Sequence, residues 1–290
     1  MNVLVIGGSG MLGSDLVSHL TERGHNVSAP SSRELDITNP ESVAVVALDP
    51  GKYDWCVNCA AYTAVDKAES DVQAATELNQ FAPGYLSNAC SMSGIKLIHI
   101  STDFVFDGEA QEPYGVSSPT HPLSVYGRTK LEGELAVLRG NTNSLVVRTS
   151  WLFGANGRCF PKTMIQLWRA GKPLSVVSDQ VGCPTSTVDL ARVIVDMIDQ
   201  NAYPGIYHAC GPTACSWFDF AVESVSTWKR LHEDDRPVGI KPIPTSSYPT
   251  PAVRPKYSVM ETSSLQSIEI QPMESLPESI RAFVNQLKLD

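Results

Sequence analysis

Tyr126 and Lys130 stand four positions apart in the segment Tyr126-Gly127-Arg128-Thr129-Lys130. On a helix this spacing places both side chains on one face, so a Lys130 ammonium would sit near the Tyr126 phenol. A free phenol has a pKa of about 10 and is a poor acid at neutral pH, but a nearby cation stabilises the phenolate and lowers that pKa. The pair therefore predicts Tyr126 as a general acid that protonates a carbonyl oxygen as a hydride arrives, with Lys130 lowering its pKa. An ordinary surface pair has the same spacing.

A second set of polar side chains, Ser101-Thr102-Asp103, follows an apolar run at 96–100. A hydroxyl at that strand end, opposite the tyrosine, would hydrogen-bond a substrate carbonyl and orient it. Neighbouring side chains of a strand point in opposite directions, and we assign the role to Thr102 rather than to Ser101. The competing interpretation is a hydroxyl that only caps a turn.

The glycine-rich segment Gly7-Gly8-Ser9-Gly10-Met11-Leu12-Gly13 lies between a predicted strand and a predicted helix. Glycines there allow a sharp turn and a close approach of the backbone to a pyrophosphate, while the helix N-terminus supplies free N–H donors. The segment predicts a dinucleotide site, and a tight turn without a ligand is the alternative. The residues expected to contact the cofactor here are Gly7, Gly10, Met11, Leu12 and Gly13.

The end of the second predicted strand bears on the choice between NADH and NADPH. An NAD site normally has a carboxylate there, which bonds the ribose 2′-hydroxyl. The sequence instead reads Ser31-Ser32-Arg33, whose side chains could receive a 2′-phosphate through charge-assisted hydrogen bonds. We therefore favour NADPH and keep NADH as the alternative; a solvated loop is the other interpretation of Arg33.

The elements that must position these residues alternate between strand and helix along the first half of the chain. Apolar runs predict strands at 3–6, 26–29, 55–59, 96–100 and 144–149. Amphipathic stretches predict helices at 11–23, 41–48 and 125–139. A long helical region is predicted at 65–93, and an irregular Pro/Gly-rich loop covers 107–123. This repeated βαβ pattern predicts an α/β fold, a Rossmann-type doubly wound parallel sheet with helices on both faces.

The second half of the chain is less regular. A strand at 174–177, a helix at 188–198 and a strand at 205–208 would continue the sheet. Loops and the prolines crowded between Pro237 and Pro255 predict a smaller, irregular α+β region. We expect a dinucleotide-binding domain at 1–154 plus about 174–211, and a substrate-binding domain at 155–173 and 212–290.

The composition excludes several classes of function. The chain has 290 residues, with 22 Lys and Arg against 31 Asp and Glu, and its net charge of -9 argues against nucleic acid as a partner. It has no apolar stretch of about 18 residues and no basic start with a cleavage site, which predicts a cytoplasmic protein rather than a membrane or secreted one.

Cysteine and histidine usage argues against a disulfide framework and a metal site. The seven cysteines are an odd number, which favours reduced thiols. Cys56 and Cys59 form a CxxC on a buried strand, where their spacing points them to opposite faces, so packing is the expected role. The six histidines show no ligand spacing, and no metal is expected.

Taken in order, the glycine-rich loop, Thr102 and the Tyr126/Lys130 pair resemble the extended short-chain dehydrogenase/reductase superfamily. Within it, the match narrows to the dTDP-4-dehydrorhamnose reductase family and covers residues 1 to about 262. The blocks that carry the narrower match are Leu35-Asp36-Ile37-Thr38, residues 58–69, Ser101-Thr102-Asp103-Phe104-Val105-Phe106-Asp107-Gly108, residues 126–134, Arg148-Thr149-Ser150-Trp151-Leu152-Phe153-Gly154, Asp179-Gln180-Val181-Gly182-Cys183-Pro184-Thr185 and Arg254-Pro255.

This resemblance implies contacts to a nicotinamide cofactor and to a nucleotide sugar. It implies that Asp36 and Ile37 flank the adenine, and that Tyr126 and Lys130 hold the nicotinamide ribose. The residues implied on the nicotinamide side are Ala60, Ala61 and Tyr62. The residues implied to contact the substrate, with Thr102 and Tyr126 at the 4-keto oxygen, are Thr63, Val65, Thr102, Asp103, Phe104, Trp151 and Arg254.

Two positions depart from the family pattern. Phe104 stands where a Tyr is common in the family, which removes any hydrogen bond from that phenol. Of an acidic trio that bridges a metal at some family dimer interfaces, only Asp15 corresponds. An interfacial Mg2+ is therefore not supported, and both a monomer and a homodimer remain open.

Trp151 and Arg254 also suit a nucleotide sugar on physical grounds. A Trp at a strand end offers an apolar platform for the C–H face of a sugar, with core packing as the alternative. Arg254 could clamp a diphosphate bidentately, with a surface ion pair as the alternative.

The resemblance implies an NAD(P)H-dependent oxidoreductase that reduces the 4-keto group of dTDP-4-dehydro-L-rhamnose to dTDP-L-rhamnose, a cell-envelope precursor. Two alternatives stay open. One is a reductase or epimerase that acts on another nucleotide sugar. The other is a non-catalytic, reductase-like regulatory subunit that keeps the cofactor site and binds a partner enzyme.

Overall fold

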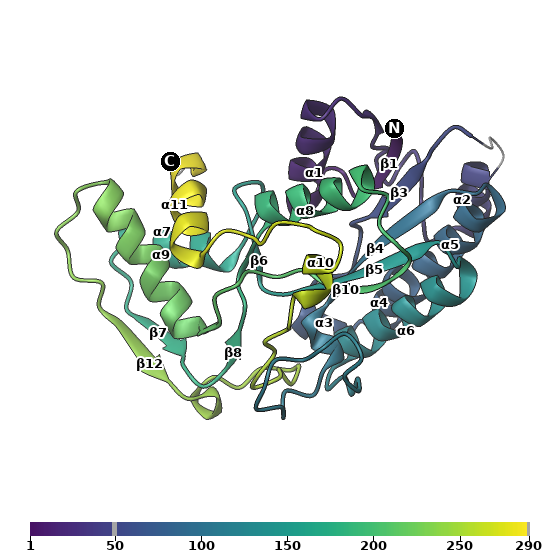
Figure 1. Ribbon diagram of the computed structural model, residues 1–290. Helices are drawn as coiled ribbons and strands as arrows, with labels where there is room; N and C mark the ends of the chain where they lie inside the picture. Colours follow the sequence, from purple (N-terminus) through teal and green to yellow (C-terminus); the bar gives the residue numbers. More distant parts are fainter. Residues whose placement is uncertain (48–50, 289–290) are drawn as a thin grey trace.

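A parallel sheet of six strands organises the computed structural model, which describes residues 1–47 and 51–288. The strands lie in the order β10-β5-β4-β3-β1-β2 (Figure 1). Their bounds are Asn2–Ile6 (β1), Asn26–Ser28 (β2), Trp55–Asn58 (β3), Lys96–Thr102 (β4), Ser144–Thr149 (β5) and Gly205–His208 (β10). The chain order reverses between β1 and β3, and ligands of such sheets bind at the carboxyl ends of the strands beside this point.

Helices cover both faces of the sheet because its central strands are apolar on both sides. α1 (Met11–Glu22) and α8 (Thr187–Asp199) pack on one face, where they meet Val3 and Val5 of β1. α2 (Pro40–Ala47), α5 (Ala82–Met92) and α6 (Val125–Gly140) pack on the other face, where they meet Leu4 and Ile6. Alternate residues of β1 thus enter two separate cores, and the predicted fold class is confirmed. The predicted helix at 41–48 includes Leu48, which lies outside the described residues.

The long helical region predicted at 65–93 is present but is divided into several pieces. The segment contains α3 (Val65–Ala68), α4 (Val72–Thr76), the π turn η1 (Glu77–Phe81) and then α5. Asp71, with φ -120°, separates α3 from α4. Pro83 has no N–H to donate to the carbonyl of Asn79, and the backbone widens into a π turn immediately before α5.

A second, smaller group of elements, which we call the second lobe, lies beside the sheet, on the left of Figure 1. Its helices are α7 (Phe160–Arg169), α9 (Trp217–Leu231) and α11 (Leu276–Gln286), which share an aromatic-rich core. Its short strands pair as β7 (Leu174–Val177) with β12 (Ile240–Ile243) and β8 (Val181–Gly182) with β11 (Cys215–Ser216). Between the two groups, β6 (Leu152–Phe153) pairs with β9 (Thr185–Ser186). The remaining short elements are the 3₁₀ turns η2 (Asp103–Val105) and η3 (Thr245–Ser247), and α10 (Ser263–Gln266).

Two segments lie elsewhere than the sequence predicts. The strand Leu174–Val177 does not continue the main sheet, because it is β7 and pairs in parallel with β12. Its residues alternate between buried and exposed or half-buried positions, whereas β3 and β5 of the main sheet are buried throughout. The segment around α10 packs on the sheet core through Leu265 and Ile270, although the predicted division places it in the substrate-binding part. With these two differences, the division into two domains remains a proposal.

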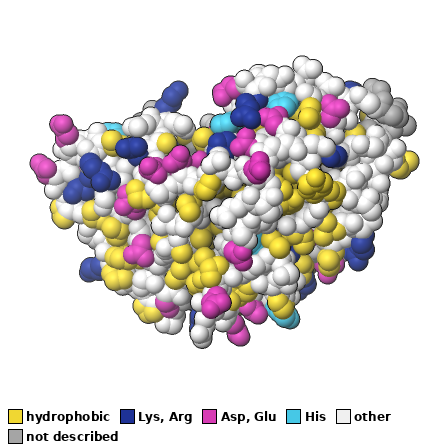
Figure 2. All heavy atoms as spheres, viewed as in Figure 1, with side chains coloured by type: hydrophobic (Ala, Val, Ile, Leu, Met, Phe, Trp, Pro, Cys, Tyr) yellow, Lys and Arg dark blue, Asp and Glu magenta, His cyan; other side chains and the backbone are white. Residues whose placement is uncertain are grey.

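The molecular surface carries charges of both signs. On the face shown in Figure 2, Lys and Arg side chains are dispersed among Asp and Glu rather than gathered in a patch. Within the described residues no helix is long and apolar enough to cross a membrane. All seven cysteines are free thiols, and Cys56 and Cys59 pack against different cores.

Candidate active site

The predicted site residues come from loops at the carboxyl edge of the sheet. The glycine-rich loop follows β1, Ala60 and Ala61 follow β3, and Thr102 ends β4. A methyl group on Gly7 would lie 2.9 Å from the backbone nitrogen of Ala60, so the first two segments are in direct contact. The topology therefore brings together segments that the sequence separates by about 50 residues each.

The glycine-rich loop has the shape that a bound pyrophosphate requires. Any Cβ on Gly13 would overlap the carbonyl oxygen of Gly7, so only glycine permits this packing of helix against strand. The N-terminus of α1 has no side-chain cap, and its first turn carries no acidic residue. Its N–H groups and the positive end of the helix dipole are thus available to an anion, and the residues present fit a dinucleotide. Leu12 is buried below the loop and Met11 is half-buried beside the second lobe.

The segment Ser31-Ser32-Arg33 after β2 is exposed, and of these three residues only Ser31 is held by hydrogen bonds in the described part of the chain. Ser31 bonds Glu34 Oε2 through its backbone nitrogen at 2.8 Å and its hydroxyl at 2.9 Å. Arg33 is exposed, and its side chain forms no hydrogen bond or ion pair within the described residues. A methyl group on Gly8 would come within 2.7 Å of the Cβ of Ala29, which places the end of β2 beside the glycine-rich loop.

Asp36 and Ile37 face different surroundings. The Asp36 carboxylate accepts hydrogen bonds from the backbone nitrogen and hydroxyl of Thr38, at 2.9 and 2.7 Å, which lower its pKa. Ile37 is 4% exposed and packs in the core beneath α2 and α5. Its side chain therefore supports this loop from below.

Thr102 and Tyr126 meet where the end of β4 faces the start of α6. The Thr102 side chain lies close enough to the Tyr126 phenol to lower the Tyr126 pKa, and its hydroxyl donates to Asp103 Oδ1 at 3.1 Å. Thr102 Oγ1 also accepts a bond from the Phe104 backbone nitrogen at 3.2 Å, so it caps η2 as well. Gly127 permits this meeting because a Cβ there would overlap the Phe104 carbonyl oxygen. The Phe104 ring meets the Tyr126 ring edge-on, with centroids 5.5 Å apart.

Burial dominates the acidity of the central groups. It raises the pKa of Tyr126 to about 12, against the contact from Thr102 and with a further increase from the Asp103 charge. Burial likewise raises the pKa of Asp103 to about 6, and it lowers the pKa of Lys130 to about 8. The Lys130 Nζ atom donates to the Ile100 carbonyl at 2.6 Å and lies 3.4 Å from His99 Nε2. The predicted lowering of the Tyr126 pKa by Lys130 therefore remains a proposal.

Four buried polar residues beside the site were not identified from the sequence. Glu134 pairs with Arg148 at 2.7 Å and accepts a hydrogen bond from Ser101 at 2.5 Å, which turns Ser101 away from Tyr126. His99 Nε2 lies 3.4 Å from Lys130 Nζ, and Asn58 Nδ2 lies 3.2 Å from the other ring nitrogen of His99. The available signals were the position of Glu134 four residues after Lys130 and the place of Asn58 and His99 near the carboxyl ends of adjacent strands.

On the substrate side, Trp151 follows β5 in the left-handed region, with φ 46°. Its indole stacks on Trp217 with ring centroids 3.5 Å apart and lies over Gly182. Trp151 and Met11 join one apolar cluster, so this tryptophan lies between the second lobe and the glycine-rich loop.

The other predicted substrate contacts surround α3. Arg254 pairs with the Asp66 carboxylate of α3 at 2.8 Å and is not a free cation. Val65 begins the same helix and is half-buried, whereas Thr63 is exposed. Tyr62, which is predicted on the nicotinamide side of the cofactor, donates its hydroxyl proton to Asp71 at 3.0 Å near the same helix. Arg254 thus holds the segment around Pro255 against α3.

Asp15 is engaged within the chain. Its carboxylate accepts hydrogen bonds from Thr187 at 2.6 Å and from Asn156 at 2.9 Å. In the part of the chain that the structure describes, no group of three or more His, Cys, Asp or Glu residues could hold a metal ion.

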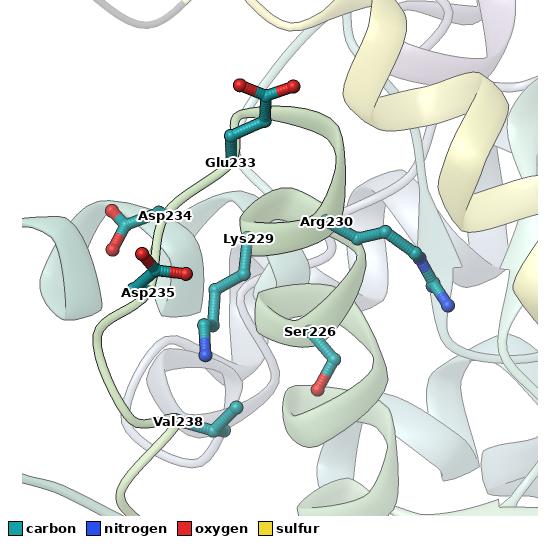
Figure 3. Close-up of a pocket in the computed structure, with 7 residues that line it drawn as sticks. All are labelled: Ser226, Lys229, Arg230, Glu233, Asp234, Asp235 and Val238. Carbon is teal, nitrogen blue, oxygen red and sulfur yellow. The ribbon is translucent and has the colours of Figure 1, made fainter.

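A surface pocket of about 300 Å³ lies at the C-terminal end of α9 (Figure 3). Its lining includes Lys229, Arg230 and three consecutive acidic residues, and it contains none of the predicted site residues. Asp234 there pairs with Arg236 at 2.7 Å. This pocket is separate from the candidate active site.

Comparison with known proteins gives matches over nearly the whole chain. The family model described as "RmlD substrate binding domain" matches residues 1–289. The chain belongs to this family. Among the relatives of this RmlD-family protein is a probable dTDP-4,6-dihydroxy-2-methyloxan-3-one 4-ketoreductase of Streptomyces antibioticus, 40% identical over 97% of the chain and 94% of the relative. A dTDP-4-dehydrorhamnose reductase of Mycolicibacterium smegmatis is 36% identical over 97% of the chain and 86% of its own length.

A solved structure agrees with these matches. The dTDP-4-dehydrorhamnose reductase of Bacillus anthracis, in complex with NADP, superimposes with a TM-score of 0.91 at 34% identity, over 98% of the chain and 99% of that protein. The predicted family and the predicted oxidoreductase class are confirmed by these relatives.

Proposed function

We propose that this RmlD-family protein reduces the 4-keto group of dTDP-4-dehydro-L-rhamnose to give dTDP-L-rhamnose, with NADPH or NADH as the reductant. The observation that carries the proposal is the meeting of Thr102 and Tyr126 at the carboxyl edge of β4, beside a glycine-rich loop whose shape fits a dinucleotide. The names of the relatives support the same reaction, and the NADP in the Bacillus anthracis structure supports the preference for NADPH.

The cofactor would be held along the carboxyl edge of the sheet. The pyrophosphate would bind at the glycine-rich loop, the adenosine half beside Ser31, Ser32, Arg33, Asp36 and Ile37, and the nicotinamide half beside Ala60, Ala61 and Tyr62. When bound, the reduced nicotinamide supplies the hydride that reaches the carbonyl carbon.

Each polar residue then has one task. Thr102 orients the carbonyl oxygen, and Tyr126 gives its proton to that oxygen as charge develops there. A protonated Lys130 supplies positive charge near the phenolate that remains. Without such help, the raised pKa of Tyr126 would make it a weak acid.

The sugar and its nucleotide would occupy the space between the sheet and the second lobe. Trp151, whose indole already stacks on Trp217, would offer only its remaining apolar surface to the ring, and Phe104 presents its ring beside Tyr126. Val65, Thr63 and Asp103 are further proposed contacts. Arg254 would have to share its guanidinium between Asp66 and a diphosphate.

The reaction is tested by mixing the purified protein with each reduced cofactor and the keto-sugar nucleotide while following the near-ultraviolet absorbance of the reduced nicotinamide. A fall in absorbance with formation of dTDP-L-rhamnose is expected. No oxidation of either cofactor would overturn the proposal, and co-purification with another enzyme would then favour the regulatory subunit.

Replacing Tyr126 with Phe tests the acid. The change keeps the edge-on ring contact with Phe104 and removes only the hydroxyl. Turnover should fall about 10²- to 10⁴-fold, the usual contribution of a positioned general acid, with little change in cofactor affinity. Equal losses of turnover and cofactor affinity would contradict the assigned role.

A second candidate substrate is a related dTDP-linked keto sugar. The Streptomyces antibioticus relative is named for a different dTDP-linked keto sugar and is 40% identical to the chain. We propose that Phe104, which lacks the phenol common in the family and lies beside Tyr126, helps to distinguish the two substrates. Comparing kcat/KM for both sugars decides between them.

A further inference from the structure

A chain of hydrogen-bonding groups runs beneath the candidate active site on the side that faces α6. Asn58 Nδ2 lies 3.2 Å from His99 Nδ1, and His99 Nε2 lies 3.4 Å from Lys130 Nζ. All three side chains are at most 2% exposed. Asn58 and His99 are register partners on β3 and β4, so the pairing of the strands fixes their separation.

The orientation of the Asn58 amide is set by the backbone. The N–H of Ala60 donates to Asn58 Oδ1 at 3.1 Å. A backbone N–H can only donate, so the oxygen must be on that side and the NH2 group must face His99. An amide NH2 also only donates, which makes His99 Nδ1 the acceptor.

The protonation of the His99 ring follows from this. Burial, together with the Lys130 charge, holds the pKa of His99 well below its ordinary value, so the ring is neutral and carries one proton. With Nδ1 acting as acceptor, that proton is on Nε2, the atom that faces Lys130. A neutral amine at Lys130 can accept this N–H, whereas an ammonium would oppose it with another donor.

We propose that Asn58 and His99 are positioning residues that present an N–H to Lys130 and thereby favour its neutral amine over its ammonium. The inference deepens the proposed function, on which it rests for the role of Lys130 beside Tyr126. The other groups around Lys130 act in the opposite direction. The Ile100 carbonyl on β4 accepts its proton at 2.6 Å, and the charge of Glu134 on α6 and the Cys59 thiol after β3 favour the ammonium.

The balance places the titration of Lys130 above neutral pH but well below that of an ordinary lysine. Glu134 is itself neutralised by Arg148 at 2.7 Å, so it only partly offsets the burial of the lysine. With a pKa of about 8, Lys130 loses its charge as the pH rises through that value. Turnover that depends on the ammonium should then decline on the alkaline side, and the proposed His99 N–H would shift that decline to lower pH.

Replacing Asn58 with Asp reverses the proton on His99 at nearly constant shape. One carboxylate oxygen would still accept the Ala60 N–H, and the other could only accept from His99, so the ring proton moves to Nδ1. His99 Nε2 would then accept from the Lys130 ammonium and stabilise it, as would the added negative charge. The alkaline limb of kcat against pH should move upward by about one unit or more. The control is Cys56→Ala, on the same strand but against the α2 and α5 core, which should leave the limb in place.

The tautomer is measured separately from activity by nitrogen NMR of protein labelled with ¹⁵N-histidine, with the His99 signals assigned by their loss in His99→Gln. The wild-type protein should show the proton on Nε2, and Asn58→Asp should show it on Nδ1. The Lys130 Cε signal, assigned by its loss in Lys130→Met, should titrate at higher pH in Asn58→Asp than in wild type.

A proton on His99 Nδ1 in the wild-type protein would overturn the proposal without any variant. The proposal would also be overturned if Asn58→Asp moves the His99 proton to Nδ1 but leaves the Lys130 titration unchanged. If every keto sugar fails as a substrate while both NMR results hold, the proposed reaction is wrong and the assigned hydrogen bonds stand.

Discussion

Replacing Glu134 with Gln should destabilise the protein far more than removing an ion pair at the surface. Glu134 accepts hydrogen bonds from Arg148 Nη2 at 2.7 Å, Arg148 Nε at 2.9 Å and Ser101 Oγ at 2.5 Å. The side chains of the pair are 1% and 4% exposed, so water cannot replace a lost partner. Removing one partner of such a pair costs about 3–5 kcal/mol because the other charge stays buried and unpaired.

The assay is the free energy of unfolding from urea titration, followed by circular dichroism. Single domains have about 5–15 kcal/mol in total, so the loss would be easy to see. Asp196→Asn is the matched control, because Asp196 pairs with two arginines at the surface. The side chain of Asp196 is 17% exposed, that of Arg23 is 51% exposed and that of Arg192 is 29% exposed. That change should cost no more than about 1 kcal/mol.

A double variant separates loss of the pair from loss of packing. Glu134→Leu combined with Arg148→Met removes both charges, and it should recover much of the stability that Glu134→Gln loses. If Glu134→Gln costs no more than Asp196→Asn, the reasoning about the buried charge is refuted.

Three further outcomes are expected. Gly127→Ala should cut turnover at least about tenfold, because its methyl group would overlap the Phe104 carbonyl and separate Tyr126 from Thr102. Gly115→Ala is the control, because the atom nearest to its methyl group would be 3.6 Å away. Equal activity of the two variants would count against the close packing at Gly127. Arg33→Ala should raise KM for NADPH about tenfold and leave that for NADH nearly unchanged, and parallel changes would show that Arg33 does not meet a 2′-phosphate. Burial and the charge of Arg148 lower the pKa of His208 from 6.5 to about 4, so the unfolded chain takes up a proton at higher pH than the folded protein does. The free energy of unfolding should therefore fall as the pH drops from about 6.5 towards 4, and it should fall less steeply in His208→Asn. A flat profile in the wild-type protein would exclude this linkage.

The sequence predicts most of the sheet because its local signals agree with the tertiary structure. The apolar runs at β1, β3, β4 and β5 are buried on both sides. The helices between them therefore pack on both faces of the sheet and shield its apolar side chains from water. The assignment of Thr102 over Ser101 rested on strand alternation, and Ser101 does point to Glu134.

The failures arise where long-range contacts decide the structure. Leu174–Val177 has the composition of a sheet strand, but its partner β12 lies more than 60 residues later and its exposed alternate residues suit a two-stranded ribbon. The interruptions of 65–93 depend on Asp71 and Pro83 in a segment whose hydrophobic pattern is otherwise helical. Asn58 and His99 become neighbours only through the register of β3 and β4, which a single sequence does not show.

The stacked indoles of Trp151 and Trp217 have an optical consequence. Parallel rings with centroids 3.5 Å apart couple their electronic transitions, so the pair forms an exciton whose circular dichroism depends on the angle and distance between the rings. Trp151 lies between β5 of the main sheet and β6, and Trp217 opens α9 of the second lobe. Any ligand that moves one lobe against the other therefore changes a spectroscopic signal that the protein carries without a label.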